Sequence, residues 1–204
     1  MNKVIKKGRP KTFNKDQASK IAMETYWKEG IENVSLNEMC RKIGESKPSV
    51  YREYGGEEGL QLAALELYYK HRVEPVAKIL FGAEEILVGI KSAFDFLIND
   101  HFKDEKIVAA CMYNREDMHP SENLSVMCKN FIEKKDKEAI SFLKEGFKKA
   151  LDKEDLKKGI NLDAYSQYIS SQLKLIASLS NNNKLPKSTL REMVDLIMTP
   201  ILSD

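Results

Sequence analysis

The stretch from Ser35 to Tyr54, SLNEMCRKIGESKPSVYREY, places the tightest constraint on what this chain can fold into. Ser35 is a favourable N-cap for a short helix, and Glu38, three residues later, completes a capping box. Gly44 stands where the end of that helix needs a residue that tolerates positive φ. The apolar stripe of the helix, at helical spacing, consists of Leu36, Met39, Cys40 and Ile43. The pattern therefore predicts one short amphipathic helix followed by a sharp turn.

A second short helix is expected directly after this turn. Ser46 is its N-cap, and Pro48 falls in its first turn, where the missing N–H of proline does no harm. Val50 and Tyr54 are four residues apart and are expected to pack inward. The side chains left to face outward are Lys47, Ser49, Tyr51 and Arg52. A helix-turn-helix whose second helix presents a cation, a hydroxyl and an aromatic ring fits docking in the DNA major groove.

Charge is distributed unevenly along the chain. Residues 1–15 carry a net charge of +6, whereas residues 16–204 carry −4. A basic arm ahead of a helix-turn-helix suits contact with DNA phosphates, with Arg9 and Lys11 as candidate contacts. A solvated chain end is the alternative interpretation of the same charges.

Composition excludes several classes of protein. Charged residues make up 31% and hydrophobic residues 42% of the chain, which excludes a largely disordered protein. No apolar run approaches the roughly 20 residues that span a bilayer, and no apolar segment follows the basic N-terminus as in a secretory signal. The three cysteines are far apart, at Cys40, Cys111 and Cys128. We therefore expect no disulfide framework, a cytoplasmic location and no membrane partner.

Helical periodicity continues along the chain, without a strand pattern or an internal repeat. A first helix is expected from about residue 14 to Gly30, and a fourth from Glu57 to Val73, ending before Pro75. Later helices are expected over residues 84–100, 107–113, 122–151, 162–179 and 190–201. We predict an all-α protein of about nine helices, divided into an N-terminal domain over residues 1–55 and a larger helical domain over residues 56–204.

Residues suited to catalysis or metal binding are scattered. The three histidines form no metal-ligand motif and no Cys-x-x-Cys is present, so no metal site is predicted. The glycine-rich run from Gly55 to Gly59 lacks both a preceding strand and a following Lys-Ser/Thr, which excludes a phosphate-binding loop. We therefore predict no enzymatic activity and no cofactor.

The last two helices carry more apolar surface than one small bundle can cover. The helix over residues 162–179 is apolar nearly all round, and the one over 190–201 has a continuous stripe at helical spacing. Self-association is the expected consequence. The residues predicted for a dimer interface are Tyr165, Ile169, Leu173, Ile176, Leu190, Met193, Val194 and Ile197.

A ligand cavity is expected among the middle helices, over residues 84–151. The residues predicted to line it are Phe94, Cys111, Met112 and Phe131. A buried, inert thiol is one interpretation of Cys111, because a reactive thiol needs an electropositive, partly exposed setting. The alternative interpretation makes Cys111 a covalent sensor of electrophiles or oxidants.

Residues 8–70 resemble the N-terminal region of the TetR/AcrR family of transcriptional regulators. The matching positions are GRPKTF, Ala18, Ala22, Trp27, Gly30, Ser35-Leu36, Gly44, Ser46 to Tyr51, and Tyr54. From residue 84 onward the chain is similar to the family only in its order of helices. The resemblance implies an all-α homodimer with a helix-turn-helix DNA-binding domain and a helical ligand-binding and dimerisation domain. It also implies a four-helix interface made by the last two helices of each chain.

The resemblance implies roles for individual residues. Ser35 matches a hydroxyl that contacts phosphate, and Tyr51 matches a second phosphate contact, whereas Tyr54 is mainly a packing residue. The positions that match base-edge contacts are Lys47, Pro48 and Ser49, flanked by Ser46 and Arg52. Two residues depart from the family pattern, because Glu57 replaces a frequent phosphate-binding lysine and Glu45 replaces an apolar turn residue. Either acid would weaken or re-angle contact with DNA.

The sequence thus predicts a repressor that binds a palindromic DNA operator as a dimer and leaves it when a small molecule enters the C-terminal domain. Its half-sites would lie about one helical turn, or a small multiple, apart. An all-α enzyme, which would turn over its ligand, is one alternative. A scaffold protein is another, and it would lack the steep salt dependence of DNA binding.

Overall fold

The computed structural model describes residues 13–99, 112, 124–181 and 185–199. The regular elements within these ranges are helices, which confirms the predicted all-α fold class. They are α1 (Lys15–Glu29), α2 (Leu36–Ile43), α3 (Lys47–Tyr54), α4 (Glu57–Tyr68), the π-helix η1 (Tyr69–Val73), α5 (Glu74–Gly82), α6 (Ile86–Asn99), α8 (Val126–Asp152), α9 (Leu162–Asn181) and α10 (Lys187–Met198). None of these described helices combines the length and the apolar character that crossing a membrane requires.

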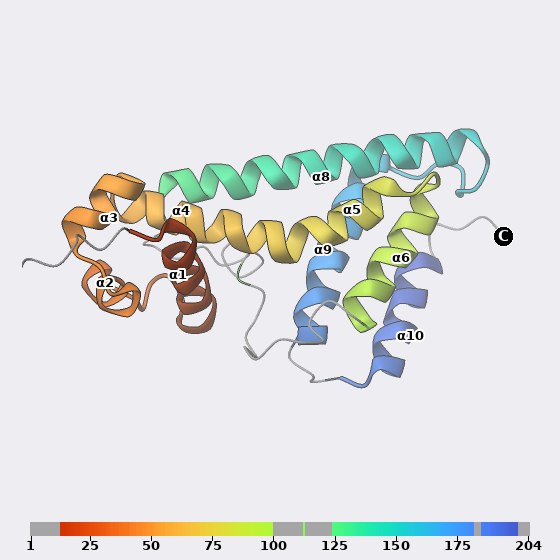
Figure 1. Ribbon diagram of the computed structural model, residues 1–204. Helices are drawn as coiled ribbons and strands as arrows, with labels where there is room; N and C mark the ends of the chain where they lie inside the picture. The colour runs from red at the N-terminus through yellow and green to blue at the C-terminus, as the bar shows by residue number, and fades with distance from the viewer. Residues whose placement is uncertain (1–12, 100–111, 113–123, 182–184, 200–204) are drawn as a thin grey trace, which may run out of the picture.

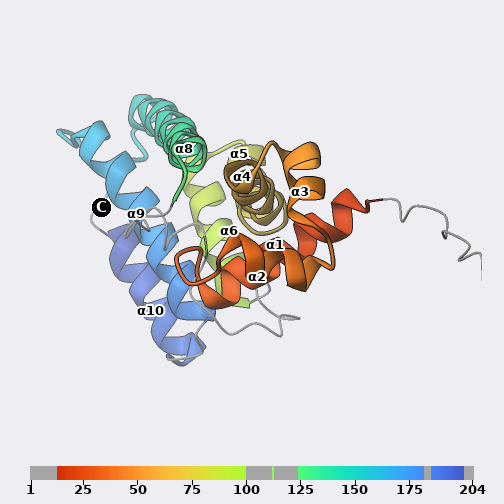
Figure 2. The ribbon, with the colours of Figure 1, turned by 90° about the vertical axis from the view of Figure 1, so that its left-hand side faces the viewer.

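The molecule is elongated, with two groups of helices joined by long ones (Figure 1). Helices α1, α2 and α3 form one end, which we call the head (residues 13–55), and α6, α9 and α10 form the other. The rod made by α4, η1 and α5 runs between them, and the long α8 lies beside this rod. Figure 2 looks at the head end-on and shows α3 and the N-terminus of α1 on the side away from α9 and α10. We call the described residues outside the head the body.

Local side-chain hydrogen bonds fix where the head helices begin. The side-chain oxygen of Asn14 accepts the N–H of Gln17 at the start of α1. The hydroxyl of Ser35 accepts the N–H of Glu38, and the hydroxyl of Ser46 accepts that of Ser49. Gly44 ends α2 at φ 76°, in the left-handed region that disfavours side chains with a Cβ. These are the boundaries that the sequence predicts for the helix-turn-helix.

Two hydrophobic clusters fill the interior of the molecule. The first joins the head to α4 and to the start of α8, and its largest buried side chains are Trp27, Tyr26, Tyr68 and Met39. The second joins α5, α6, the far half of α8, α9 and α10 around Ile90, Phe94, Phe147 and Ile169. Because the first cluster includes Leu60 and Ala64 of α4, the N-terminal helices depend on α4 for their core. The predicted domain boundary between residues 55 and 56 stays a prediction.

The fourth helix expected from Glu57 to Val73 corresponds to α4 and η1 together, but no turn separates it from the next helix. The chain passes from α4 through the π-helix η1 directly into α5, which continues to Gly82. Pro75 lies in the first turn of α5, where its missing N–H breaks no hydrogen bond of that helix. The π-helix changes the local hydrogen-bonding step, and the continuous rod can therefore contain a proline.

Gly59 marks a close approach between α3 and α4. A Cβ built on Gly59 would lie only 1.8 Å from the backbone carbonyl oxygen of Tyr54. A backbone atom cannot move aside as the end of a side chain can, so the angle between the two helices requires glycine at this position. This contact sets how the C-terminus of α3 meets α4.

Gly59→Ala is therefore expected to lower the free energy of unfolding by about 3 kcal/mol, because the new methyl group forces α3 and α4 apart. Chemical denaturation of the full chain would measure this loss. Gly82→Ala is the matched control, because a Cβ at Gly82 has nothing within 4 Å. Equal stability of the two variants would contradict the close approach.

Candidate nucleic-acid interface

Helix α3 lies at the outer side of the head (Figures 1 and 2), and its outer face is open to solvent. Lys47, Pro48 and Arg52 are exposed, and Tyr51 is 56% exposed, which is unusual for so large an aromatic side chain. Val50 on the opposite face is fully buried in the head cluster. The helix is thus held by its inner face and presents a cation, a proline and an aromatic ring outward.

Hydrogen bonds order the polar residues around this face. The hydroxyl oxygens of Ser46 and Ser49 are 3.0 Å apart and share a hydrogen bond, in addition to the N-cap that Ser46 makes. The Nε of Arg52 donates to a carboxylate oxygen of Glu53 at 2.9 Å, on the protein surface. These arrangements orient the hydroxyls and the guanidinium near the N-terminal and C-terminal ends of α3, respectively.

Tyr54 faces inward, as predicted for a packing residue. Its hydroxyl donates to the backbone carbonyl of Lys15 at 2.9 Å and is also hydrogen-bonded to the hydroxyl of Ser19. Its ring meets Phe13 edge-on, at a centroid distance of 5.9 Å, and the Lys15 ammonium lies 5.2 Å from the ring centroid. Burial raises the pKa of Tyr54, so the hydroxyl remains a donor at neutral pH. Tyr54 thus fastens α3 to the start of α1.

Ser35, the predicted phosphate contact, lies at the edge of an acidic hollow of about 520 Å³. Four carboxylates line this hollow, namely Glu32, Glu38, Glu57 and Glu58, together with Gln61 and Ser125. Glu57 is the first residue of α4, where a negative charge stabilises a helix N-terminus. Glu57 stands out as an unusual acid in the sequence alone, whereas the other three acids do not, because their proximity depends on how the α1–α2 loop meets α4.

Glu45, the second unusual acid, occupies the turn between α2 and α3. Its backbone N–H donates to the carbonyl oxygen of Cys40 at 3.0 Å, which closes the end of α2 together with Gly44. Its side chain is partly buried. The backbone of this turn therefore has the helix-ending geometry that the sequence predicts, with glutamate in place of an apolar residue.

Three of the predicted site residues lie outside the described residues: Arg9, Lys11 and Cys111. The other cysteines, Cys40 and Cys128, are buried free thiols. Burial raises the pKa of Cys40 even though Lys47 acts in the opposite direction, so its thiol is protonated. Among the described residues, no cluster of three or more histidine, cysteine or acidic side chains could hold a metal ion.

The predicted ligand residues do not share one cluster. Phe94 is fully buried in the body cluster, whereas Met112 is fully buried in the cluster of the head. Phe131 is partly buried against the head cluster and meets Tyr69 edge-on at 5.6 Å. Phe94 thus lies apart from the other two. Their role in ligand binding stays a prediction.

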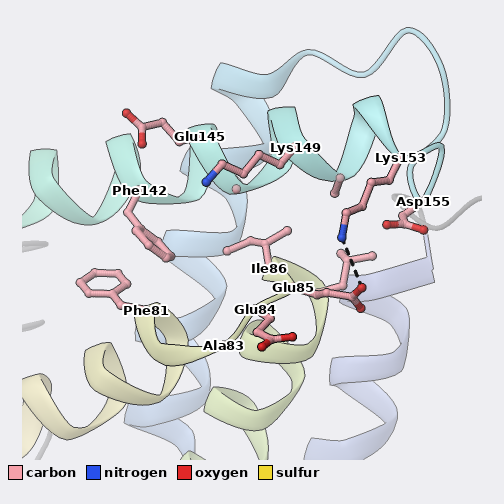
Figure 3. Close-up of a pocket in the computed structure, with 13 residues that line it drawn as sticks. Phe81, Ala83, Glu84, Glu85, Ile86, Phe142, Glu145, Lys149, Lys153 and Asp155 are labelled. Carbon is pink, nitrogen blue, oxygen red and sulfur yellow. Dashed lines mark hydrogen bonds and ion pairs between the residues drawn. The ribbon is translucent and has the colours of Figure 1, made fainter.

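Two hollows open on the body instead. The larger, of about 370 Å³, lies between the α5–α6 turn and the far half of α8 (Figure 3). Phe81 and Phe142 pack together at one side of it, with ring centroids 4.2 Å apart, and Lys153 pairs with Glu85 at the other. The smaller, of about 120 Å³, lies where η1 and α5 meet α8 and α9. Sequence periodicity marks all these residues as core or surface and cannot show where packing leaves space.

The structure separates the predicted dimer residues into two groups. Four of them are buried in the core of the chain itself, namely Ile169, Ile176, Leu190 and Ile197. The other four are only partly buried, namely Tyr165, Leu173, Met193 and Val194. Tyr168, Leu175 and Leu196 lie outside the predicted set but are exposed apolar residues, and Leu196 is 72% exposed. The helical periodicity of the last two helices indicates apolar residues on two sides. It does not show which of these sides packs into the core of the chain itself.

Comparisons with known proteins point to one kind of protein. No family model matches the chain. The HTH-type transcriptional repressor ComR of Escherichia coli (strain K12) is 30% identical over 105 residues, which are 52% of this chain and 50% of ComR. The HTH-type transcriptional repressor BdcR of the same strain is 33% identical over 73 residues, 36% of this chain and 37% of BdcR. The chain thus spans at most half the length of these curated relatives.

Solved structures share the fold over nearly the whole chain. A cysteine mutant of the TetR family transcriptional regulator CifR, complexed with 26-bp double-strand operator DNA, has a TM-score of 0.76 to this chain at 20% sequence identity. The match covers 95% of this chain and 100% of CifR. The resemblance seen in residues 8–70 is therefore confirmed, and the chain has the fold of the TetR-family transcriptional regulators.

Proposed function

We propose that this protein is a DNA-binding transcriptional repressor that acts as a homodimer and leaves its operator when a small molecule binds the body. The exposed face of α3 carries the proposal, because a buried Val50 fixes the helix while Lys47, Pro48 and Tyr51 face outward. An α-helix with its side chains is about 10–12 Å across, which suits the major-groove width of about 12 Å. Base contacts are assigned to the N-terminal residues of α3, and phosphate contacts to Tyr51, Arg52 and Ser35.

Several observations support this assignment. The curated relatives ComR and BdcR are named repressors, and CifR, which shares the fold, has been solved on operator DNA. The predicted basic arm, with Arg9 and Lys11, would add phosphate contacts beside α3.

We assign residues 1–55 to DNA binding and residues 56–204 to dimerisation and effector binding. We place the protein in the cytoplasm with its DNA partner, and we propose no catalytic role.

The homodimer would form through the outer stripe of α9 and α10. On α9, one stripe at helical spacing contains Tyr165, Tyr168, Gln172, Leu175 and Leu179, all of which are exposed or partly exposed. On α10, Thr189, Met193 and Leu196 continue this pattern. Two such helices from each chain would form a four-helix interface. Each dimer would then present two α3 helices to two half-sites.

Regulation requires that the effector bind the DNA-free conformation more tightly than the DNA-bound one. A coupling free energy of about 1–3 kcal/mol is typical of such switches. The rod of α4, η1 and α5 is the route by which the body can move the head, since α4 supplies part of the core of the head. A covalent sensor based on Cys111 remains the second form of the proposal.

Selection of bound sequences from random duplex DNA, at fixed salt with the purified full-length chain, tests the main proposal. An enriched palindrome is expected, and the spacing of its halves would report the geometry of the dimer. A folded dimer that enriches no sequence would overturn the proposal in favour of a scaffold role.

Lys47→Ala and Tyr51→Ala should each weaken operator binding by about tenfold or more without changing the unfolding transition, because both side chains are exposed. Fluorescence anisotropy with a labelled operator would measure the loss. Lys78→Ala on α5 is the control, since it removes the same charge far from α3. Normal binding by both α3 variants would exclude this face as the reading surface.

Glu57→Lys should tighten operator binding by about tenfold and raise the salt slope by about one unit, because it exchanges repulsion at the acidic hollow for a phosphate contact. Titrations at several salt concentrations would show both effects. Glu145→Lys, at the far hollow of Figure 3, makes the same change of charge and should have little effect. If both variants behave alike, only net charge matters and Glu57 does not face DNA.

Leu175→Glu and Leu196→Glu should each convert the dimer into monomers, because a charge would be buried in the proposed interface. Light scattering after size exclusion would give the mass. Val88→Glu on α6 is the control, since Val88 is exposed but outside the stripe. A dimer that survives both stripe substitutions would place the interface elsewhere.

A further inference from the structure

The smaller hollow of the body lies beside the π-helix η1. Tyr69, Arg72 and Val73 of η1 form one wall, α5 continues it, and α8 and α9 close it from the other side. Figure 1 shows α5, α8 and α9 converging at this part of the molecule. Parts of the chain that are far apart in the sequence therefore meet around this hollow.

Apolar side chains make up most of its lining, with nine of the sixteen residues. The larger ones are Val73, Val76, Leu80, Phe81, Leu97 and Leu173. The volume is about 120 Å³. An apolar cavity of about 150 Å³ is known to hold benzene, so this hollow suits a body of about six carbon atoms.

Two ion pairs contain four of the five charged residues of the lining. The ammonium of Lys174 on α9 lies 2.8 Å from a carboxylate oxygen of Asp136 on α8, and both side chains are only 19% exposed. Lys135 pairs with Glu138 at 2.9 Å. Because each pair is neutral as a whole, neither offers a counter-charge to a ligand without being broken.

Arg72 is the fifth charged residue of the lining. Its guanidinium lies over the ring of Trp27, 5.6 Å from the centroid, and the face of an indole ring attracts a cation. A charged ligand would therefore lose its hydration in this hollow and find the charged groups already engaged. The lining thus favours an uncharged molecule.

Ser170 on α9 adds a hydroxyl to the lining. Ser170 is only 7% exposed, and its hydroxyl makes no hydrogen bond with the residues that the structure describes. The neighbouring Ser166 and Ser171 differ, since each donates to the backbone carbonyl four residues earlier in α9. Buried hydroxyls normally have a partner, and a ligand with one uncharged oxygen would supply it.

We propose that this hollow is the effector site and that its ligand is a compact uncharged ring compound with a single hydroxyl or carbonyl oxygen, placed at the Ser170 hydroxyl. The inference rests on the proposed repressor function and adds to it the site and the chemical class of the effector. The apolar ring of the ligand would lie against α5, and its oxygen would lie at α9.

The π-helix gives this site a path to the head. Arg72 contacts Trp27 of α1, which belongs to the buried cluster of the head. Tyr69 meets Phe131 of α8 edge-on, and the Lys135 ammonium lies 5.2 Å from the centroid of the Tyr69 ring. Residues of η1 thus line the hollow and contact both α1 and α8, at a helical irregularity of a kind often found at functional sites.

The larger hollow does not share these properties. It lies at the end of the molecule away from the head, and six charged side chains stand around it: Glu84, Glu85, Glu145, Lys149, Lys153 and Asp155 (Figure 3). These are almost half of its 13 lining residues. An uncharged apolar molecule would therefore find less apolar surface to cover there, which makes this hollow the internal control.

Four probes of similar shape test the ligand class: toluene, benzyl alcohol, benzoate and benzylamine. Calorimetry on the full-length chain without DNA should show toluene and benzyl alcohol each binding at least about tenfold more tightly than the two charged probes. Binding of benzoate or benzylamine as tightly as benzyl alcohol, or binding of none of the four, would overturn the proposal.

Ser170→Ala tests where the oxygen of the ligand lies. The variant should weaken binding of benzyl alcohol by about fivefold and leave binding of toluene unchanged, because only the alcohol loses a hydrogen bond. Ser171→Ala is the matched control, since Ser171 is the next residue of α9 and is exposed. Unchanged binding of benzyl alcohol by Ser170→Ala would overturn the assigned position.

Ala139→Phe tests whether the hollow itself is the site. The new ring should fill the hollow and abolish binding of both uncharged probes, with the helical content checked by circular dichroism. Ala83→Phe at the larger hollow should leave their binding unchanged. Loss of binding with Ala83→Phe but not with Ala139→Phe would overturn the assignment.

Operator release provides the functional readout. Benzyl alcohol should release the wild-type chain from its selected operator and should fail to release Ala139→Phe. Because calorimetry needs no DNA, a chain that binds benzyl alcohol but never binds an operator would refute the repressor function and not the ligand site. A chain that stays on its operator with benzyl alcohol bound would refute the effector role.

Discussion

The contact of α1 with α4 is the interaction on which the rest of the structure depends. Trp27 and Tyr68 meet edge-on at 5.2 Å, and each is at most 1% exposed. Burying two such large rings stabilises this contact by several kcal/mol. Three short helices could not bury enough apolar surface alone, so α3 keeps its position, with its outer face exposed, because α4 completes the core of the head. Tyr68 also directly precedes η1, so the same contact lies where α4 passes into the π-helix.

Local chemistry explains why the head was predictable from the sequence. Serine caps, a glycine with positive φ and a proline in the first turn act within a few residues, and Ser35, Gly44 and Pro48 do in the structure what their types predict. The inward position of Tyr54 followed from its spacing to Val50. The hydrogen bonds of Tyr54 to the start of α1 span more than 30 residues, and no local pattern contains them.

The body was less predictable because its properties depend on packing between distant helices. Apolar residues on both sides of α9 indicated self-association, but Ile169 and Ile176 proved to be core while Leu175 is exposed. The continuation of the rod through Pro75 depends on the π-helix before it, which has no sequence signature here. The smaller hollow likewise arises where side chains from α5, α8 and α9 fail to meet, and its ion pair joins residues 38 apart.

The acidic hollow and the proposed release by a small molecule fit one energetic scheme. The binding free energy of a small ligand is bounded at about −1.5 kcal/mol per heavy atom in the best cases. Only part of that energy can differ between the two conformations, so the coupling it supplies is limited to a few kcal/mol. Release from a very tightly bound operator would require more coupling free energy than such a ligand can supply. Under the proposed function, the four carboxylates beside Ser35 would oppose the attraction of the basic arm for phosphate, and they would keep operator affinity within the range that a small effector can reverse.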